Sequence, residues 1–507
     1  MNLKHPYPKL LLSFAFFSLF ILNCSKNDDP PIVQNPDPVD NPVVLNNEIH
    51  DFIWEGMNEI YLWQENVPNL ADNKFTNQDS YYTFLNGYNT PESLFDALIY
   101  QKDVVDKFSF IVDDYVELEN SFQGNTNSSG LDFGLVRLSG SDDIFGYVRY
   151  VANNSDASTK NIGRGEFFLT VNGQQLTINN YVDLLFGANN SLTLGMASIS
   201  NNTISLNGKS VPLTKTNFTE NPILISKVID ANGTKVGYIM YNQFINSFDN
   251  ALNDAIGQLK ADGITELVLD LRYNPGGFVS SAINLSSMIT GQFTGNVFSK
   301  EIWNSRYQSY FQANNPESLI NRFVDKLSDN TAINALNMNK IYVLTTRGSA
   351  SASELVINGL KAHINVIQIG TRTTGKYTAS ATLYDSKDFS KNNVNPAHKY
   401  AIQPLIYKSA NALGVTDYYN GLIPDHVITY ASGSGTSEGE DILNLGILGD
   451  QSEPFLAKAL SLITGSTTKY NAYNQKSQLG FKIEHIADSK DFAPLGKDMI
   501  VDFKLAK

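Results

Sequence analysis

The amino-acid sequence predicts a layered α/β domain inside a multi-domain α+β chain. Three strand–turn–helix units carry this prediction. Their apolar, strand-like runs cover residues 235–241, 266–271 and 341–345, and helix-spaced stretches follow at 248–259, 278–289 and 353–361. One more apolar run, at 366–369, predicts a further strand. Because consecutive parallel strands need crossover connections, repeated units of this kind indicate a sheet covered by helices.

The composition limits the number of domains and the classes of partner and cofactor that the chain can have. The chain has 507 residues, of which 42% are hydrophobic and 17% charged, enough for two or three folded domains. The net charge of −14 argues against nucleic acid and against an anionic membrane surface as partners. Cys24 is the only cysteine and no His-Glu-x-x-His spacing occurs, so neither a disulfide within the monomer nor a metal or other cofactor is expected.

The N-terminus has the pattern of an export signal. Lys4 and Lys9 precede an apolar run at 10–22 that is too short to span a bilayer comfortably, and Cys24 follows it. This resembles a bacterial lipoprotein processing site. It implies a signal peptide over 1–23, lipidation at Cys24, and a location in the bacterial cell envelope, lipid-anchored on the periplasmic or outer face. An ordinary secreted protein is the alternative. The proline-rich stretch 24–45 predicts a disordered tether.

Two smaller domains are predicted ahead of the α/β core. Apolar residues at helical spacing, among them Phe52, Ile53 and Met57, indicate a helical domain over 46–125. Residues 126–222 are rich in strand-like runs, at 145–151, 167–171 and 191–196, with a short helix at 180–186. The core then covers 223–465, within which 290–339 is an insertion of unassigned structure. A C-terminal extension, 466–507, is expected to supply an extra strand or a tail.

The β-rich region resembles a PDZ domain. The stretch 162–173, Ile-Gly-Arg-Gly-Glu-Phe-Phe-Leu-Thr-Val-Asn-Gly, is similar to a PDZ signature. PDZ domains bind a free peptide C-terminus as an added strand. The resemblance implies that a glycine-rich loop, with Gly130, Leu131, Phe133 and Gly134, binds the peptide. A generic β-sandwich is the alternative.

The turn at 348–354, Gly-Ser-Ala-Ser-Ala-Ser-Glu, lies between a predicted strand and a predicted helix. Backbone N–H groups and a helix N-terminus meet at such a turn, which suits a nucleophile, but a serine also needs a base. None of the histidines (5, 50, 363, 398, 426 and 485) stands in a recognisable triad context, although His426 stays open.

A lysine is the other candidate base. The stretch 370–376, Gly-Thr-Arg-Thr-Thr-Gly-Lys, is close to a phosphate-binding loop, but Tyr377 replaces the required Ser or Thr and the next residues alternate like a strand. A lysine can act as a general base when burial lowers its pKa from about 10.4. No acidic residue lies within several positions of Lys376, which suits a desolvated amine.

A family resemblance selects among these readings. The serine turn, the loop Asn274-Pro275-Gly276-Gly277, the pair Gly375-Lys376 and the element Gly421-Leu422-Ile423-Pro424-Asp425 together resemble the C-terminal processing peptidases, or tail-specific proteases. In that family the middle serine is the nucleophile and the base lysine lies 25 positions later, which points to Ser351 and Lys376. The resemblance implies a core of the ClpP/crotonase type and a serine-type endopeptidase that takes a polypeptide through its C-terminus.

The resemblance also assigns supporting roles. The backbone N–H groups of Gly277 and Ala352 would hold the oxyanion. Glu354 would orient Lys376. Many family members place a glutamine four positions after the lysine for this role, where this chain has Ser380, so the orienting residue stays open between Glu354 and Ser380. A peptide-binding lipoprotein that keeps the fold without catalysis is the alternative function. The natural substrate and the oligomeric state stay open.

Overall fold

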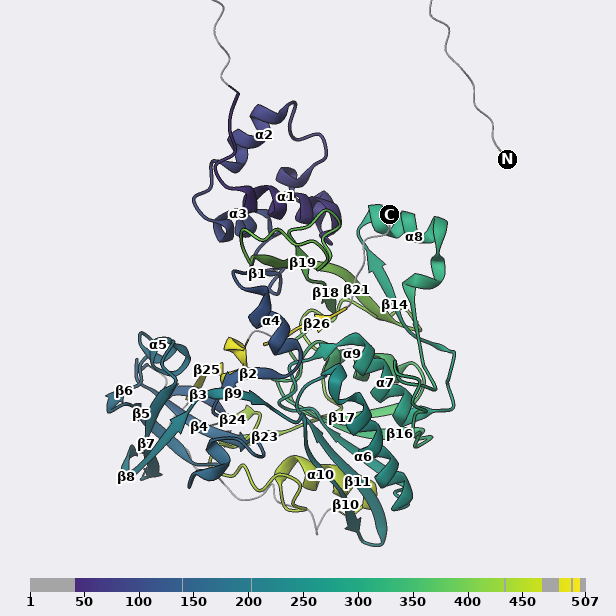
Figure 1. The fold of residues 1–507 in the computed structure, drawn as a ribbon. Coiled ribbons are helices and arrows are strands. Elements are labelled where there is room, and N and C mark those ends of the chain that lie inside the picture. The colour runs from purple at the N-terminus through teal and green to yellow at the C-terminus, as the bar shows by residue number, and fades with distance from the viewer. Residues whose placement is uncertain are drawn as a thin grey trace, which may run out of the picture. The chain divides into compact units, whose positions relative to one another are not determined.

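Figure 1 shows the fold in a computed structural model, which describes residues 42–138, 140–201, 203–432, 435–466, 483–493 and 496–501. The chain divides into two units, residues 1–44 and residues 45–507, and all elements below belong to the second. The predicted signal peptide, Cys24 and most of the predicted tether lie outside the described residues. Within the described part, no helix is both long and apolar enough to cross a membrane.

A six-stranded sheet forms the centre of the α/β core. Its strands, in spatial order, are β10 (Ile223–Ala231), β11 (Thr234–Tyr241), β12 (Glu266–Asp270), β16 (Lys340–Thr345), β17 (Asn365–Gly370) and β22 (His426–Val427). All neighbours pair in parallel except β10 and β11, which form an antiparallel hairpin. The strands predicted at 235–241, 266–271, 341–345 and 366–369 are thereby confirmed.

Helices cover both faces of this sheet (Figure 1). Ile239 and Tyr241 of β11 pack in one apolar cluster with residues of α6 (Asp249–Ala261), α7 (Val279–Thr290) and α9 (Ala352–Lys361). Tyr238 and Met240 of the same strand pack in another, with residues of α10 (Pro454–Thr464). Because successive strand side chains point to opposite faces, burial of both faces explains the nearly continuous apolar runs in the sequence.

A second six-stranded sheet contains the insertion that the sequence left unassigned. Its order is β13 (Gly277–Phe278), β26 (Met499–Ile500), β18 (Thr378–Ser380), β21 (Leu405–Asn411), β14 (Val297–Trp303) and β15 (Ile320–Arg322). The insertion supplies β14 and β15, with α8 (Ser305–Asn314) between them. The C-terminal extension supplies β26, which lies between β13 and β18.

The N-terminal region is helical, as predicted. It contains α1 (Glu48–Ile60), α2 (Gln78–Leu85), α3 (Pro91–Leu98) and α4 (Tyr115–Phe122). Phe52, Ile53 and Met57 of α1 are buried, as their spacing indicates. The region joins the core through β1 (Phe110–Val112), which pairs with β20 (Ala401–Gln403), itself paired with β19 (Leu383–Tyr384).

A separate sheet holds the β-rich region. Its order is β25 (Ile483–Asp488), β3 (Leu131–Leu138), β4 (Ile144–Val151), β5 (Phe167–Val171), β7 (Ser191–Ser200) and β8 (Thr203–Thr214), with β6 (Gln174–Gln175) paired to β5. The helix α5 (Tyr181–Phe186) packs on it. Two short pairs lie beside it, β2 (Asn125–Ser128) with β9 (Thr216–Thr219), and β23 (Thr429–Ser432) with β24 (Gly435–Glu438).

The predicted peptide-binding loop has a different conformation from the one expected. Only Gly130, with φ +75°, lies outside a strand, whereas Leu131, Phe133 and Gly134 belong to β3. The reason is packing, because Leu131, Phe133 and Leu135 alternate along the strand and enter the same apolar cluster. A bulge between Asp132 and Phe133 interrupts the pairing of β3 with β4.

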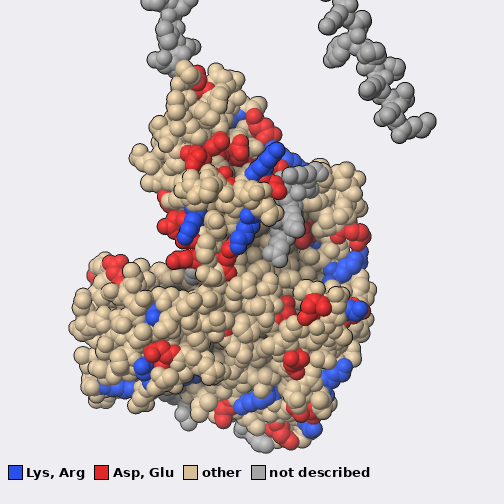
Figure 2. All heavy atoms as spheres, in the orientation of Figure 1, with Lys and Arg blue, Asp and Glu red and all other residues tan. Residues whose placement is uncertain are grey.

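Charged side chains are dispersed over the surface in view. On the face that Figure 2 shows, basic and acidic side chains are interspersed, and most of the surface carries neither. This distribution accompanies the net charge of −14. It differs from the concentrated basic face typical of proteins that bind nucleic acid.

Candidate active site

Ser351 lies at a strained strand-to-helix turn. It follows β16 and immediately precedes α9, with φ 62° and ψ −113°. A left-handed φ is uncommon for a residue with a side chain and is often retained at functional sites. Ser351 is fully buried, and its Oγ has no hydrogen-bond partner among the described residues. The predicted nucleophile is therefore a hydroxyl that the fold leaves unengaged.

The other two serines of the turn have structural contacts. Ser349 Oγ donates a hydrogen bond to the carbonyl of Leu271 (2.8 Å), and Ser353 Oγ donates one to the carbonyl of Asn274 (3.0 Å). The backbone N–H of Ala350 also donates to the Asn274 carbonyl (3.1 Å). Together these bonds attach the serine turn to the loop that follows β12.

That loop carries the predicted oxyanion donor. Gly276 and Gly277 have φ of +117° and +131°, values that favour glycine. A Cβ atom on Gly277 would stand 2.0 Å from the carbonyl oxygen of Phe244, and one on Gly276 would stand 2.6 Å from Ser351 Cβ. Asn274 fixes the loop, because its Oδ1 accepts from the Gly276 N–H (2.9 Å) and its Nδ2 donates to the Tyr241 carbonyl (2.8 Å).

Ala352, the second predicted oxyanion donor, is buried at the first position of α9. The first N–H groups of a helix have no partner within the helix, so this N–H is free of the helical ladder. Its position directly after Ser351 matches the role that the resemblance implies. The two predicted donors thus come from separate elements that flank the nucleophile.

Lys376 belongs to the loop between β17 and β18. The chain enters a strand after this lysine instead of a helix, so the phosphate-binding-loop reading of 370–376 is wrong. Lys376 is fully buried, and its Nζ lies 5.0 Å from the centre of the Phe108 ring. The sequence predicted an amine without an acidic neighbour, but Nζ donates to Oδ1 of Asp498 (2.7 Å). The two residues are distant in sequence, and the fold alone brings them together.

Glu354 connects the serine turn to the lysine loop. Its buried carboxylate accepts from the backbone N–H groups of Ser351 (2.9 Å), Gly375 (2.7 Å) and Lys376 (2.9 Å), and from the hydroxyl of Thr373. Burial raises the pKa of Glu354 to about 7, against the opposing effect of these four donors. Its contacts are thus with the backbone of Lys376, so it positions both predicted catalytic residues through their main chain.

Ser380, the other candidate for orienting the lysine, makes different contacts. Its Oγ donates to the carbonyl of Met499 (3.2 Å) and accepts from Nε2 of Gln403 (3.2 Å). The element 421–425 packs on the lysine loop, where Leu422 N donates to the Thr373 hydroxyl (2.7 Å). Asp425 accepts from the Gln368 N–H on β17 (2.8 Å), so this element holds the lysine loop against the central sheet.

Asp498 is the residue of the site that sequence reasoning missed. Its carbonyl oxygen accepts from the Gly277 N–H at 2.6 Å, while its carboxylate accepts from Lys376. The sequence around it, Gly-Lys-Asp-Met, carries no motif. The expected extra strand in the C-terminal extension was the only available signal, and it gave no position for that strand.

A buried charge network involves Arg272, which belongs to the loop 271–277; this loop carries the predicted oxyanion donor Gly277 and is called here the oxyanion loop. The guanidinium of Arg272, fully buried, pairs with Asp270 (2.8 Å), Glu453 (2.6 Å) and Glu440 (3.2 Å). Arg164, from the stretch 162–173 of the β-rich region, pairs with the same Glu440 (2.8 Å). Burial alone would raise the pKa of Glu440, but these two guanidinium groups lower it. The network therefore connects the β-rich region to the residues just before Asn274.

Two of the histidines considered from the sequence lie on, or contact, strands of the two core sheets. His426 lies on β22, and His363 contacts the carbonyl of Val297 through Nε2 (2.9 Å). Across the described ranges, no group of three or more His, Cys, Asp or Glu side chains is arranged to hold a metal ion. The candidate site is thus built from Ser351, Lys376 and the groups that contact them.

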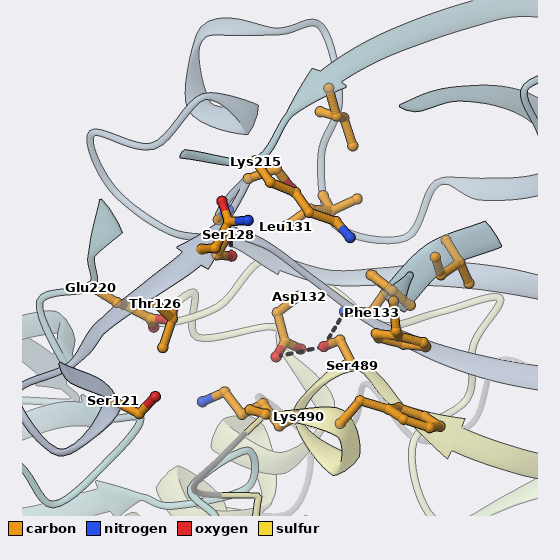
Figure 3. A pocket seen from close by; sticks show the side chains of 18 of the residues that line it. Ser121, Thr126, Ser128, Leu131, Asp132, Phe133, Lys215, Glu220, Ser489 and Lys490 are labelled. Atoms are coloured by element: carbon orange, nitrogen blue, oxygen red, sulfur yellow. Dashed lines mark hydrogen bonds between the residues drawn. The ribbon is translucent and has the colours of Figure 1, made fainter. Parts of the chain in front are cut away.

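A cavity of about 680 Å³ lies beside β3 (Figure 3). Its lining includes the predicted peptide-binding residues Gly130, Leu131 and Phe133, and also Pro275 of the oxyanion loop. Ser489 and Lys490 of the C-terminal extension form another part of its wall. The predicted peptide-binding residues and the oxyanion loop therefore border one cavity.

Two family models and several curated proteins match parts of this chain. The model of "Peptidase family S41" matches residues 235–401, and that of "Peptidase S41 N-terminal domain" matches residues 48–110. A "Carboxyl-terminal-processing protease" of Picosynechococcus sp. is 27% identical over 223 residues, which are 44% of this chain and 47% of the relative. A "Probable CtpA-like serine protease" of Staphylococcus aureus is 30% identical over 151 residues, 29% of this chain and 26% of the relative. The chain thus matches about half, or less, of the length of these curated relatives.

The fold has a counterpart among solved structures. An S41 protease structure from Bacteroides fragilis is 23% identical and superposes with a TM-score of 0.62, covering 82% of this chain and 97% of that one. The likeness supports the mixed α/β architecture. The two family models and the curated relatives lead to one conclusion: over residues 48–110 and 235–401 the chain is similar to the peptidases of family S41, and part of it is similar to a carboxyl-terminal-processing protease.

Proposed function

We propose that the chain is a serine-type endopeptidase that cleaves polypeptides near their C-termini, with Ser351 as nucleophile and Lys376 as general base. The observation that carries this proposal is the juxtaposition around one peptide group. The carbonyl of Asp498 accepts from the Gly277 N–H at 2.6 Å. A Cβ atom on Gly276 would stand 2.5 Å from that carbonyl oxygen and 3.0 Å from Ser351 Oγ. A peptide carbonyl therefore fits beside the serine hydroxyl and a backbone donor.

The mechanism follows from these positions. Ser351 Oγ attacks the substrate carbonyl while the neutral amine of Lys376 takes its proton. The N–H groups of Gly277 and Ala352 stabilise the oxyanion, and donors of this kind contribute about 3 kcal/mol each. Lys376 then protonates the leaving amine, and a water molecule, activated in turn, hydrolyses the acyl-enzyme. Glu354 keeps both residues in place through its backbone contacts.

The β-rich region is proposed to bind the substrate's C-terminus in the manner of a PDZ domain. Without β25, β3 would be an edge strand of its sheet, open to an added peptide strand. The cavity beside Gly130, Leu131 and Phe133 borders that edge and reaches Pro275. Gly134 lies on the same strand. A peptide bound in this cavity would therefore lie close to Pro275 of the oxyanion loop.

The test is cleavage of an unstructured protein, casein, by the full chain. Ser351→Ala and Lys376→Ala should each abolish cleavage, and circular dichroism checks that the core of both variants stays folded. Lys376→Arg should do the same, because an arginine keeps the charge but does not release its proton in proteins. Ser198→Ala, at an exposed position on β7, is the matched control and should cleave as the parent does. Since Asp498 engages Lys376 in the structure, every chain is assayed both with Asp498 and with Asp498→Asn. Cleavage that persists in the Ser351 and Lys376 variants would refute the proposed pair.

One observation favours the alternative, a peptide-binding protein without catalysis. Lys376 donates to Asp498, and Ser351 Oγ has no partner in the described structure, so the two predicted catalytic side chains share no hydrogen bond here. On this alternative, casein would remain intact with every chain, including those that carry Asp498→Asn, while peptides would still bind. The same assay therefore separates the two functions.

We also propose that Cys24 anchors the protein by lipidation in a bacterial cell envelope. The support is the order of basic head, short apolar run and cysteine in the sequence. Metabolic labelling with a radioactive fatty acid should mark the parent chain expressed in a bacterium and leave Cys24→Ser unlabelled. Equal labelling of both chains would exclude this anchor.

A further inference from the structure

The described residues 483–493 and 496–501, called here the C-terminal segment, follow the path proposed for the substrate. We propose that this segment is an intramolecular inhibitor: it holds the peptidase latent by occupying both the peptide-binding edge of β3 and the catalytic cleft. This inference rests on the proposed function of Ser351 and Lys376. Three sets of contacts carry it.

The first is a strand position inside the catalytic cleft. In β26, Met499 and Ile500 pair in parallel with Gly277 and Phe278 of β13. On the other side Ile500 pairs with Ser380 of β18, and the Val501 N–H donates to the Ser380 carbonyl (3.1 Å). Without the segment, β13 of the oxyanion loop and β18 after the lysine would border a slot one strand wide. A peptide strand is the ligand that such a slot accepts.

The second set is at the catalytic groups themselves. The Asp498 carbonyl accepts a hydrogen bond from the N–H of Gly277, the group proposed to stabilise the oxyanion. The Asp498 carboxylate forms an ion pair with Lys376, with 2.7 Å between Oδ1 and Nζ, and both side chains are almost completely buried. Lys376 Nζ is thus bonded to Asp498, while Ser351 Oγ has no partner among the described residues. The segment thus imitates a substrate main chain while its side chain disables the base.

The third set attaches the segment to the β-rich region. In β25, Ile483 to Asp488 pair antiparallel with Leu138 to Gly134 of β3, as an added strand. Arg149 pairs with Asp488 (2.8 Å), and Ser489 Oγ donates to Asp132 (3.1 Å; Figure 3). The ring of Phe492 stacks on that of Phe186 in α5 with centroids 4.1 Å apart. The edge of β3 is thereby closed to another peptide.

Further contacts join the two attachment points. Lys490 Nζ donates to the carbonyls of Asn242 and Tyr273, both at 3.0 Å, and Tyr273 directly precedes Asn274 of the oxyanion loop. Lys497 pairs with Asp491 (2.9 Å), which holds the residue before Asp498 against the turn at 489–492. The segment is therefore fixed along its described length and not only at one end.

The first experiment compares full chains in the casein assay. Asp498→Asn removes the charge that engages Lys376, and Ile500→Asp places a charge in the buried cluster of Leu118, Phe122 and Phe278. Both should raise the initial cleavage rate at least tenfold over the parent. Asp254→Asn, an exposed position on α6 with the same charge change, should leave the rate unchanged. Measurable and equal cleavage rates in all four chains would overturn the inhibitor role and leave the peptidase function intact.

A second experiment supplies the inhibitor in trans. A synthetic hexapeptide with the sequence of residues 496–501, Gly-Lys-Asp-Met-Ile-Val, should inhibit the Asp498→Asn chain competitively. The same peptide with asparagine in place of the aspartate should be at least tenfold weaker. Inhibition by neither peptide, or by both equally, would contradict the assigned role of the carboxylate.

Two further measurements distinguish failure of the inhibitor role from failure of the proposed peptidase function. In chains carrying Ser351→Ala, the fluorescent hexapeptide should bind more tightly when Asp498→Asn is also present. If no chain cleaves casein but binding rises in this way, the proposed peptidase function is wrong. The claim that the C-terminal segment occupies the slot between β13 and β18 is then still supported. Intact mass spectrometry tests the reverse case. If the parent chain cleaves itself after Asp498 and the Ser351→Ala chain stays intact, the segment is a substrate. That result would overturn its role as inhibitor.

Discussion

The ammonium nitrogen of Lys376 lies 2.7 Å from Oδ1 of Asp498, and the two residues are 122 positions apart in sequence. Lys376 is fully buried, and Asp498 is 5% exposed. Removing one partner of a buried ion pair leaves the other charge without compensation, which typically costs about 3–5 kcal/mol. The attachment of the C-terminal segment should therefore depend on both partners together.

Lys376→Ala should accelerate hydrogen exchange at the amides of residues 499–501, because it leaves the Asp498 carboxylate buried alone. Adding Asp498→Ala to that variant should restore part of the protection, since the unpaired charge is then gone. We expect a coupling of about 2 kcal/mol from the double-mutant cycle. Hydrogen exchange followed by mass spectrometry measures it.

The exposed pair Lys408–Asp417 (3.0 Å) provides the control cycle. Surface pairs contribute only about 0–1 kcal/mol, so its coupling should be small and should not change exchange at 499–501. If the two cycles give the same coupling, the Lys376–Asp498 pair does not hold the segment.

In the Asp498→Asn chain, Gly276→Ala should reduce casein cleavage by a factor on the order of 100, since displacements of 1 Å at reacting groups can cost that much. The added Cβ would stand 2.6 Å from Ser351 Cβ, and φ is +117°. Gly295→Ala is the matched control: its φ is +81° and a Cβ there meets nothing within 4 Å. It carries a similar backbone cost without obstructing the cleft and should retain activity. Thermal denaturation of both variants checks that the core stays folded; equal activities would contradict the steric argument.

Glu354 should make stability depend on pH in the direction opposite to most carboxylates. Burial raises its pKa from 4.5 to about 7. Between these values the folded protein keeps a proton that the unfolded chain has lost, so the free energy of unfolding falls as pH rises through that interval. The difference corresponds to about 3 kcal/mol.

Chemical denaturation from pH 4.5 to 8 measures this effect in the parent and in Glu354→Gln, which cannot titrate. Burial also raises the pKa of Glu301 to about 7 and that of Asp249 to about 6, and both chains share these contributions. The difference between the two profiles isolates Glu354. Parallel profiles would show that Glu354 does not titrate in this range.

How far the sequence could predict the structure depended on how local the determining forces were. The strands before the serine turn and the oxyanion loop were predictable, because burial on both faces produces continuous apolar runs. The insertion 290–339 was not, because Tyr307 is the one buried residue of α8 and so gives no apolar stripe. The place of Asp498 in the site could not be predicted, because its partners Lys376 and Gly277 come from other parts of the chain.

Glu354 illustrates an intermediate case. Its place three residues after Ser351 indicated either a helix cap or a group that orients the lysine. In the structure the carboxylate accepts from the Ser351 N–H at the start of the helix and also from the backbone N–H of Lys376. Only the packing of the lysine loop against α9 decides this, and no local pattern reports that packing.

Arg272→Met should destabilise the fold by about 3–5 kcal/mol, because it leaves Asp270, Glu453 and Glu440 buried without their common cation. Arg306→Met is the control, since Arg306 is 36% exposed and pairs with carboxylates at the surface, where such pairs contribute about 0–1 kcal/mol. Urea denaturation of the full chains gives both values. A loss below about 1 kcal/mol for Arg272→Met would contradict the expected cost of leaving the three carboxylates without this cation. In that case the network would not be what fixes the loop that carries Gly277.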